Sequence, residues 1–298
     1  MHAIFAIEPE AINNWPVLRY AVEKFGYSKG LLIARYPGKW ERMVMEACRR
    51  NGVNELDMLR VVERLQTIKS DRLVRMGLPY GDGDWLENVG AEGVLNRLSA
   101  ILVRNQVVSE KFHRLDDAEE NLFENRRDFR VKRTATELAQ AAKYVLAASD
   151  SVVLVDRYFQ SKPKCTKVLC AMFAACQEAG SLPSQVIIFS DHTRDPRALD
   201  VVRQEYRDLL GGWVERGVRV TIVRLAGDQL DQDVHARYLF NQKAGLRFDR
   251  GFVEPEAHGE REHDTDVSCM DAAFVIELYT RFIEGRDSLK VVDAVMLE

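Results

Sequence analysis

The sequence predicts an α/β fold in two parts, and three observations support this. The chain has 298 residues, which is long for a single hydrophobic core. Apolar residues make up 46% of it, enough to build well-packed cores. The second part alternates short apolar runs with segments of helical periodicity. We therefore expect a mainly helical N-terminal domain over residues 1–133, followed by an α/β domain over residues 134–298 in which helices cover both faces of a sheet.

The N-terminal part is expected to be mainly helical after one short strand. The apolar run Ala3–Ile7 has the length of a buried strand. Asp84 and Glu87 have the spacing of a capping box, which marks the start of a helix. Two further short apolar runs, at residues 31–34 and 100–103, are candidate strands. Apolar periodicity predicts the longer helices, at residues 12–25, 40–50 and 55–68.

The C-terminal part alternates helices and buried strands with short connections. Thr134 and Glu137 form a second capping-box pattern, which opens a helix that runs to Ala148. Because the connecting segments are short and helical, the strands should be parallel and covered by helices. The predicted strands are Ser151–Val155, Gln185–Phe189 and Val218–Val223, with helices over residues 166–178 and 196–210 between them.

The pattern then changes to a β-hairpin. Arg237–Phe240 and Gly245–Phe248 show alternating apolar residues, and Asn241–Ala244 has the composition of the turn between them. Ser268 can cap a following helix that ends near residue 285, and Val291–Met296 is a last candidate strand.

Charged side chains follow several of these strands. In parallel α/β sheets, ligands bind beyond the carboxyl ends of the strands, so groups at neighbouring ends should form one polar pocket. Guanidinium groups there can hold a phosphate by forked hydrogen bonds, and a histidine can attack phosphorus or move a proton. The candidate catalytic residues are His235, Arg237 and His192. The candidate substrate-binding residues are Asp156, Arg157, Tyr158, Asp191, Asp249 and Arg250.

Structural roles are the alternatives for several of these residues. Asp156 can serve only to cap a loop, and Arg250 can pair with Asp249 at the surface. For His192 a structural role is the favoured interpretation, whereas for His235 the two roles are evenly balanced.

Two other polar segments receive a structural interpretation. His258 and His263 lie close to Asp264 and Asp266, a set of ligand types that can bind zinc or manganese. A mobile charged loop over residues 254–266 is favoured, and we expect no metal site. The basic residues between positions 126 and 133 are interpreted as a solvated face rather than as a surface that binds phosphate backbones.

The order of elements, together with the segments VVLVDRYF and DVHARYLFNQKAGLRFDRGF, resembles a divergent branch of the phospholipase D superfamily. That family carries an H-x-K-x4-D motif followed by a Gly-Ser-x-Asn element. His235 matches the histidine, Arg237 stands where lysine is usual, Gln242 stands where aspartate is usual, and Gly251 lies near the Gly-Ser element. The sequence is also similar to bacterial phospholipase D-like proteins with an H-x-R-Y hairpin, and to the phospholipase D-like domain that follows MIT domains. The resemblance covers residues 134–298.

The resemblance implies a phosphodiesterase that works without a metal or other cofactor, and a nuclease above all. One histidine would attack phosphorus and a second would protonate the leaving group. Because the chain has one such motif, the second histidine would come from a symmetric homodimer or from a substitute such as His192. The ligand would be nucleic acid or another phosphodiester.

Two alternatives remain open. In the first, the protein is a catalytically degenerate accessory protein that binds phosphate or nucleic acid. It would belong to a bacterial defence or mobile-element system, and its N-terminal domain would dock a partner protein. In the second, it is a regulatory scaffold with a vestigial pocket. For all three we expect a cytoplasmic protein. The N-terminus lacks a signal-peptide pattern, no apolar run approaches the length of a membrane span, and the five cysteines show no C-x-x-C spacing.

Overall fold

The computed structural model describes all residues except 108, 119, 125 and 228–236. The chain divides into two compact units, Met1–Arg126 and Arg127–Glu298. The division falls before residue 133 because the strand β6 (Asp128–Lys132) pairs with β12 (Asp264–Cys269) in the sheet of the second unit.

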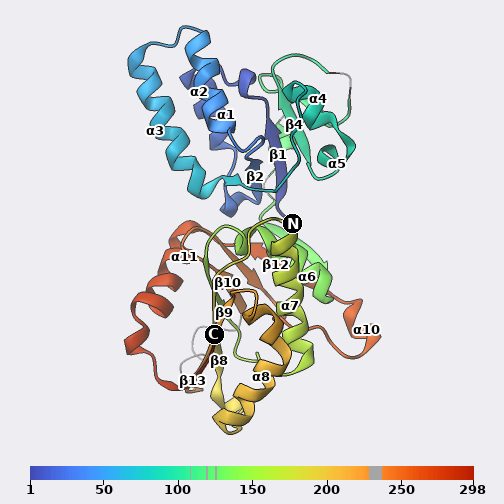
Figure 1. The fold of residues 1–298 in the computed structure, drawn as a ribbon, viewed down its shortest axis with the longest axis vertical. Coiled ribbons are helices and arrows are strands. Elements are labelled where there is room, and N and C mark those ends of the chain that lie inside the picture. Colours follow the sequence, from blue (N-terminus) through green and yellow to red (C-terminus); the bar gives the residue numbers. More distant parts are fainter. Residues whose placement is uncertain (108, 119, 125, 228–236) are drawn as a thin grey trace. The chain divides into compact units, whose positions relative to one another are not determined.

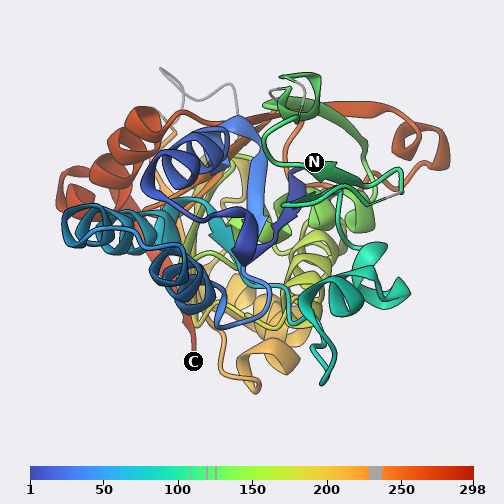
Figure 2. The same ribbon diagram turned by 90° about the horizontal axis from the view of Figure 1, so that it is seen from above.

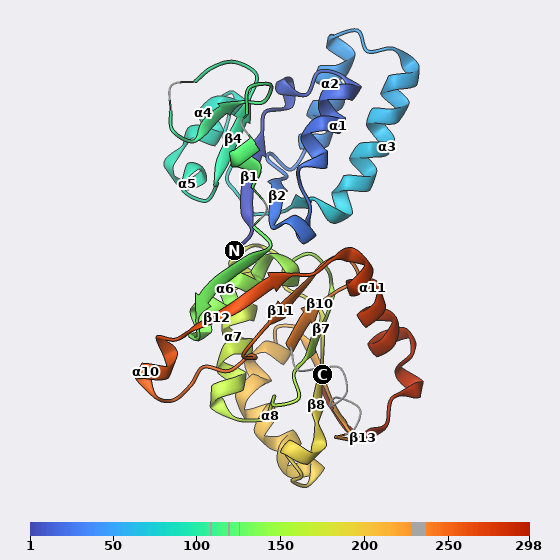
Figure 3. The ribbon, with the colours of Figure 1, turned by 180° about the vertical axis from the view of Figure 1, so that it is seen from behind.

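The first unit contains a five-stranded sheet in the order β3-β2-β1-β4-β5, and all of its pairings are parallel. Its strands are β1 (Ala3–Ile7), β2 (Leu31–Ala34), β3 (Leu73–Val74), β4 (Ala100–Val103) and β5 (Phe112–Arg114). The longer helices are α1 (Trp15–Glu23), α2 (Trp40–Arg50) and α3 (Glu55–Asp71), and the shorter ones are α4 (Trp85–Gly90) and α5 (Glu92–Leu95). Within this unit, α1 to α3 gather on one side of the strands and α4 and α5 on the other (Figures 1 and 3).

The expectation of a mainly helical N-terminal part is therefore corrected. Its helices hold more residues than its strands, but the strands form a central parallel sheet, which makes this unit α/β as well. Leu73–Val74 and Phe112–Arg114 are too short to show a sequence periodicity, so only the pairing partner reveals them as strands. The predicted capping box of α4 is confirmed, since the Asp84 carboxylate accepts from the Glu87 N–H and the Glu87 carboxylate from the Asp84 N–H.

The second unit contains an eight-stranded sheet in the order β13-β9-β8-β7-β10-β11-β12-β6. The α/β class and the parallel β-α-β-α-β core predicted from the sequence are confirmed, because β7, β8 and β9 pair in parallel. Their bounds are β7 (Ser151–Val155), β8 (Gln185–Asp191) and β9 (Arg219–Leu225). The remaining pairings are antiparallel and involve β10 (Arg237–Phe240), β11 (Gly245–Phe248), β12, β6 and β13 (Val291–Leu297).

Helices cover both faces of this second sheet. The helices α6 (Ala135–Leu146), α7 (Pro163–Glu178) and α8 (Leu199–Val214) lie on one face, and α11 (Ala272–Tyr279) lies on the other (Figures 1 and 3). Figure 2 shows the same helices in the view from above. On the α11 face, Phe189 and Phe240 of the sheet pack with Phe282 in one buried cluster. Each aromatic side chain buried in this way contributes about 1.5–3 kcal/mol, so this cluster holds α11 on the sheet.

Two predictions near the end of the chain are wrong. Ser268 does not cap a helix but lies within β12, and α11 begins four residues later, at Ala272, with Asp271 as its N-cap. The expected loop over residues 254–266 instead contains the short helix α10 (His258–Arg261) and the start of β12. The strands β6 and β12 carry charged residues at alternate positions, because those side chains face outward while Val131 and Val267 face the core.

Candidate anion-binding site

The candidate residues come together at one edge of the second sheet. β7 and β8 end at this edge, and β10 begins there because it runs antiparallel to β7. The register places Tyr238 beside Val155, so Arg237 lies level with Asp156. On the other side of β7, the Asp191 N–H donates to the Arg157 carbonyl at 3.3 Å. The structure therefore brings the residues at these strand ends next to one another.

Asp156 is completely buried and connects three segments of the site. Its Oδ1 accepts from the Tyr158 N–H at 2.9 Å, and its Oδ2 accepts from the Phe252 N–H at 3.1 Å. The Arg237 guanidinium lies 3.8 Å from Oδ1. Burial raises the pKa of Asp156, and the two N–H groups and Arg237 act in the opposite direction. Asp156 thus caps a loop, as one alternative held, and also fixes Arg237.

Gly251 is required where it approaches Asp156. Its φ of +79° is in the left-handed region that favours glycine. A Cβ on Gly251 would lie 2.7 Å from Asp156 Oδ2 and 3.3 Å from Arg237 Nε. A side chain at this position would displace the carboxylate or the guanidinium.

Asp191 plays a similar anchoring part at the end of β8. Its buried Oδ2 lies 3.2 Å from Arg157 and 4.0 Å from Arg194. Its Oδ1 accepts from both the N–H and the hydroxyl of Thr193, at 2.8 and 2.7 Å. These contacts begin the 3₁₀ turn over His192–Arg194 and direct two arginines to the same edge.

The central feature of the site is the Tyr158 ring, which three guanidinium groups approach. The ring centroid lies 5.4 Å from Arg157, 5.0 Å from Arg194 and 5.2 Å from Arg237, within the range of cation–π contacts. Tyr158 is 39% exposed, so the cluster is open to solvent. Three positive charges held around one accessible ring by buried carboxylates form a preorganised site for an anion. The sequence analysis did not select Arg194, although it lies in the same strand-end segment as His192.

The two candidate histidines differ in what the structure describes. His192 opens the 3₁₀ turn after β8, and among the described residues its buried Nδ1 has no hydrogen-bond partner. His235 lies outside the described residues.

Asp249 and Arg250 follow β11 at the same edge. Arg237 donates to the Asp249 carbonyl oxygen. The Arg250 Nε lies 3.9 Å from Asp249 Oδ2, in the exposed surface pair that one alternative described. The Arg250 backbone N–H donates to the Thr265 hydroxyl at 3.3 Å.

Other polar residues of interest lie away from this cluster. Gln242, which stands where the phospholipase D motif has aspartate, is exposed in the hairpin turn at the opposite end of β10. His258 belongs to α10, and His263 precedes β12. Within the part of the chain that the structure describes, no three His, Cys, Asp or Glu side chains form a group that could hold a metal ion. Likewise, no described helix is both long enough and apolar enough to cross a membrane.

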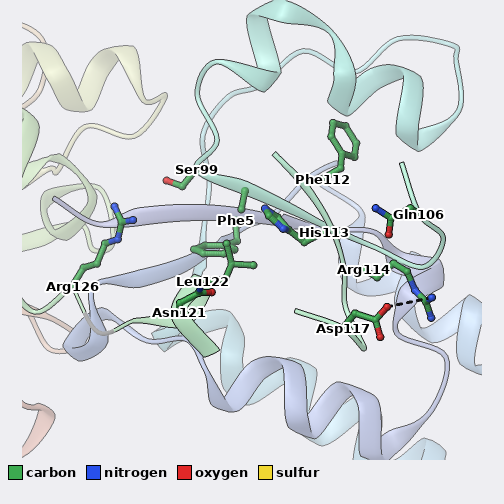
Figure 4. A pocket seen from close by; sticks show the side chains of 11 residues that line it. Phe5, Ser99, Gln106, Phe112, His113, Arg114, Asp117, Asn121, Leu122 and Arg126 are labelled. Carbon is green, nitrogen blue, oxygen red and sulfur yellow. Dashed lines mark ion pairs between the residues drawn. The ribbon is translucent and has the colours of Figure 1, made fainter. Parts of the chain in front are cut away.

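A separate hollow of about 530 Å³ lies within the first unit. Figure 4 shows His113 near its centre, Arg126 at one end and the ion pair between Arg114 and Asp117 at the other. None of the site residues predicted from the sequence lines it.

Comparisons with known proteins give structural similarities only. No family model matches the chain, and no curated protein matches it. The structure is similar to NucT from Helicobacter pylori, with a TM-score of 0.36 and 10% identity over 55% of this chain and 96% of that one. It is also similar to Nuc from Salmonella typhimurium, a phospholipase D family member, with a TM-score of 0.34 and 10% identity over the same shares. TrmBL2, an archaeal chromatin protein with a novel mode of DNA binding, has a TM-score of 0.30 and 15% identity over 93% of this chain and 81% of its own. At these values the similarities concern the arrangement of the backbone.

Proposed function

We propose that this protein is a metal-independent phosphodiesterase, and specifically a nuclease, that acts through His235. The observation that supports the proposal is the cluster of three guanidinium groups around Tyr158, because these positive charges would attract a phosphate to the strand that His235 precedes in the sequence. The H-x-R motif, which resembles that of phospholipase D, supplies the nucleophile in this proposal.

In the proposed reaction a His235 nitrogen attacks phosphorus, and the bond from phosphorus to the leaving oxygen breaks. Arg237 and Arg157 stabilise the negative charge on the phosphoryl oxygens during this step. His192 donates a proton to the leaving alkoxide. It then accepts a proton from the water that cleaves the phosphohistidine bond, which restores His235. We assign His192 this role because it opens the 3₁₀ turn after β8, the same short segment that brings Arg194 to the Tyr158 ring.

The proposal is tested by hydrolysis of bis(p-nitrophenyl) phosphate in the presence of a chelator. His235→Ala should reduce the rate by about 100-fold or more. His192→Ala should reduce it by a smaller factor, because p-nitrophenolate is a good leaving group that depends little on protonation. Gln242→Ala is the matched control and should leave the rate unchanged, since Gln242 is exposed at the other end of β10. Full activity of His235→Ala would overturn the proposal.

The second candidate function is binding of a phosphodiester without turnover. It is favoured by the presence of Arg237 in place of the family's lysine, and by the ion pairs and hydrogen bonds that already engage Arg157 and Arg237. Salt-sensitive binding of an oligonucleotide, with no hydrolysis by the wild-type protein under any condition that folds it, would support this function.

A further inference from the structure

The edge that carries the Tyr158 cluster continues beyond Arg237 across three more strands. β11 ends there, since Phe248 pairs with Arg237 and is followed by Asp249 and Arg250. β12 begins there, because the Arg250 N–H donates to Thr265. β6 also ends there, with Lys132 beside Asp264. The residue that follows β6 is Arg133, which the pairing therefore places on the same edge.

Arg133 is held close to the other arginines. Its backbone N–H donates to the carbonyl oxygens of Arg261 and His263, at 3.2 and 3.3 Å. Burial lowers the pKa of Arg133, and the positive charges of Arg250 and Arg237 lower it further, while Glu260 acts in the opposite direction. Among the described residues, the buried Nε of Arg133 has no hydrogen-bond partner. A half-buried guanidinium beside two like charges is electrostatically unfavourable unless an anion joins them.

Together these residues form an arginine row, which we define as the side chains of Arg194, Arg157, Arg237, Arg250 and Arg133. The row follows the strand ends from β8 to β6, a distance of five strand spacings in the order of the sheet. At about 4.8 Å for each spacing, the strand ends that carry the row span about 24 Å. That length far exceeds one phosphodiester group. It matches consecutive phosphates of one nucleic-acid strand, whose charges follow one another every 3.4 Å or so along the axis even when the bases are stacked.

The exposure of the side chains agrees with an extended ligand. The carboxylates of Asp156 and Asp191 are buried, whereas Arg194 and Arg250 are 46% and 51% exposed. Opposing charges also lie along the row: Asp249 is 69% exposed, and Glu260 acts on Arg133.

We propose that the arginine row binds consecutive phosphates of a single nucleic-acid strand, so that the substrate is an oligonucleotide rather than a small phosphodiester. This proposal rests on the proposed function, which sets where on the row the strand is cleaved. It adds Arg133, Arg194 and Arg250 as residues that determine substrate length. Asp249 weakens the binding of the strand by repulsion.

Binding is measured with the full chain carrying His235→Ala, by fluorescence anisotropy of a labelled single-stranded octanucleotide and of a labelled dinucleotide. Arg133→Ala together with Arg250→Ala should weaken octanucleotide binding by about tenfold or more. It should also lower the slope of log affinity against log salt by about 0.7 for each arginine removed. Binding of the dinucleotide should change little. Asp249→Asn should tighten octanucleotide binding several-fold.

The control is Arg219→Ala, which removes an exposed arginine from the start of β9, at the opposite edge of the sheet. Unchanged affinity and salt slope in the Arg133/Arg250 double variant would overturn the arginine row. So would binding of phosphatidylglycerol vesicles that is tighter than octanucleotide binding and depends on the same two arginines.

The two proposals can fail separately. If bis(p-nitrophenyl) phosphate hydrolysis depends on His235 but octanucleotide binding does not depend on Arg133 and Arg250, the arginine row is wrong and the proposed function stands. If the double variant loses octanucleotide binding while His235→Ala keeps full hydrolysis, the proposed function is wrong and the arginine row stands.

Discussion

Arg224 of β9 and Asp293 of β13 form a two-pronged ion pair, in which Nε and one terminal nitrogen of the guanidinium each donate to a different carboxylate oxygen. The other terminal nitrogen donates to the carbonyl oxygens of Asp195 and Arg197, at 2.8 and 3.0 Å. Arg224 is only 2% exposed. One buried side chain therefore fixes the segment that follows β8, which carries His192 and Arg194 into the candidate site.

Replacing Arg224 should therefore disturb both stability and the site. Arg224→Met leaves Asp293 without its partner and two carbonyl groups without a donor, so the free energy of unfolding should fall by about 3 kcal/mol. Urea denaturation measures this change. Arg203→Met is the control, because Arg203 forms a surface pair with Asp200 on α8 and should cost well under 1 kcal/mol. Equal losses of unfolding free energy in the two variants would show that the buried network of Arg224 contributes no more to stability than a surface ion pair.

A second prediction concerns Gly251 and separates backbone strain from steric overlap. Gly251→Ala introduces both backbone strain and steric overlap, since φ is +79° and the new Cβ would lie 2.7 Å from Asp156 Oδ2. Gly180→Ala introduces backbone strain without overlap, since φ is +80° and nothing lies within 4 Å of the new Cβ. Gly180→Ala should cost about 1–2 kcal/mol. Gly251→Ala should cost more and should also weaken octanucleotide binding, as measured by denaturation and anisotropy. If both variants lose equal stability and neither loses binding, the approach of Gly251 to Asp156 does not matter.

The sequence could predict elements that are buried and long enough to show a period. Ala3–Ile7 and Trp40–Arg50 were predicted with their observed bounds, because an apolar run or a helical stripe defines each of them locally. The strands β6 and β12 were missed because each carries charged residues on its outer face, and only their pairing with each other distinguishes them from a charged loop.

The same difference between local and long-range information applies to the site. The rule about strand ends selected Asp156, Asp191 and Arg237, because each ends, directly follows or opens a strand with a clear apolar pattern. Arg133 could not be placed at this edge while β6 was unrecognised, and it was grouped with a solvated basic face. Arg194 was missed because its approach to Tyr158 depends on the 3₁₀ turn after β8, which has no apolar signature.

The buried carboxyl of Asp156 gives a prediction about pH with a defined sign. Burial raises its pKa above the ordinary value of 3.8, so the folded state takes up a proton more readily than the unfolded state does. The contribution of Asp156 to stability is therefore greatest below its unfolded pKa and is lost as the pH rises through its folded pKa. The difference in free energy of unfolding between wild type and Asp156→Asn should shift in favour of the wild type as the pH falls from 7 towards 4. A shift in the opposite direction would show that Arg237 and the two N–H donors outweigh burial.

His2 provides a pH-dependent element in the first unit. Burial lowers the pKa of His2 from 6.5 to about 4, with a smaller effect from the positive charge of the N-terminus, while a backbone hydrogen bond with Tyr27 acts in the opposite direction. The folded state thus binds a proton on His2 less readily than the unfolded state does. The stabilisation that His2 contributes is present in full above pH 6.5 and is lost progressively as the pH falls towards 4, by about 3 kcal/mol in total.

His2→Phe retains an aromatic ring beside Tyr27, which His2 contacts edge-on at 5.8 Å, but it cannot be protonated. Over this range, the unfolding free energy of the variant should therefore fall less steeply with decreasing pH than that of the wild type. Parallel pH profiles for the two proteins in urea denaturation would contradict this role for His2.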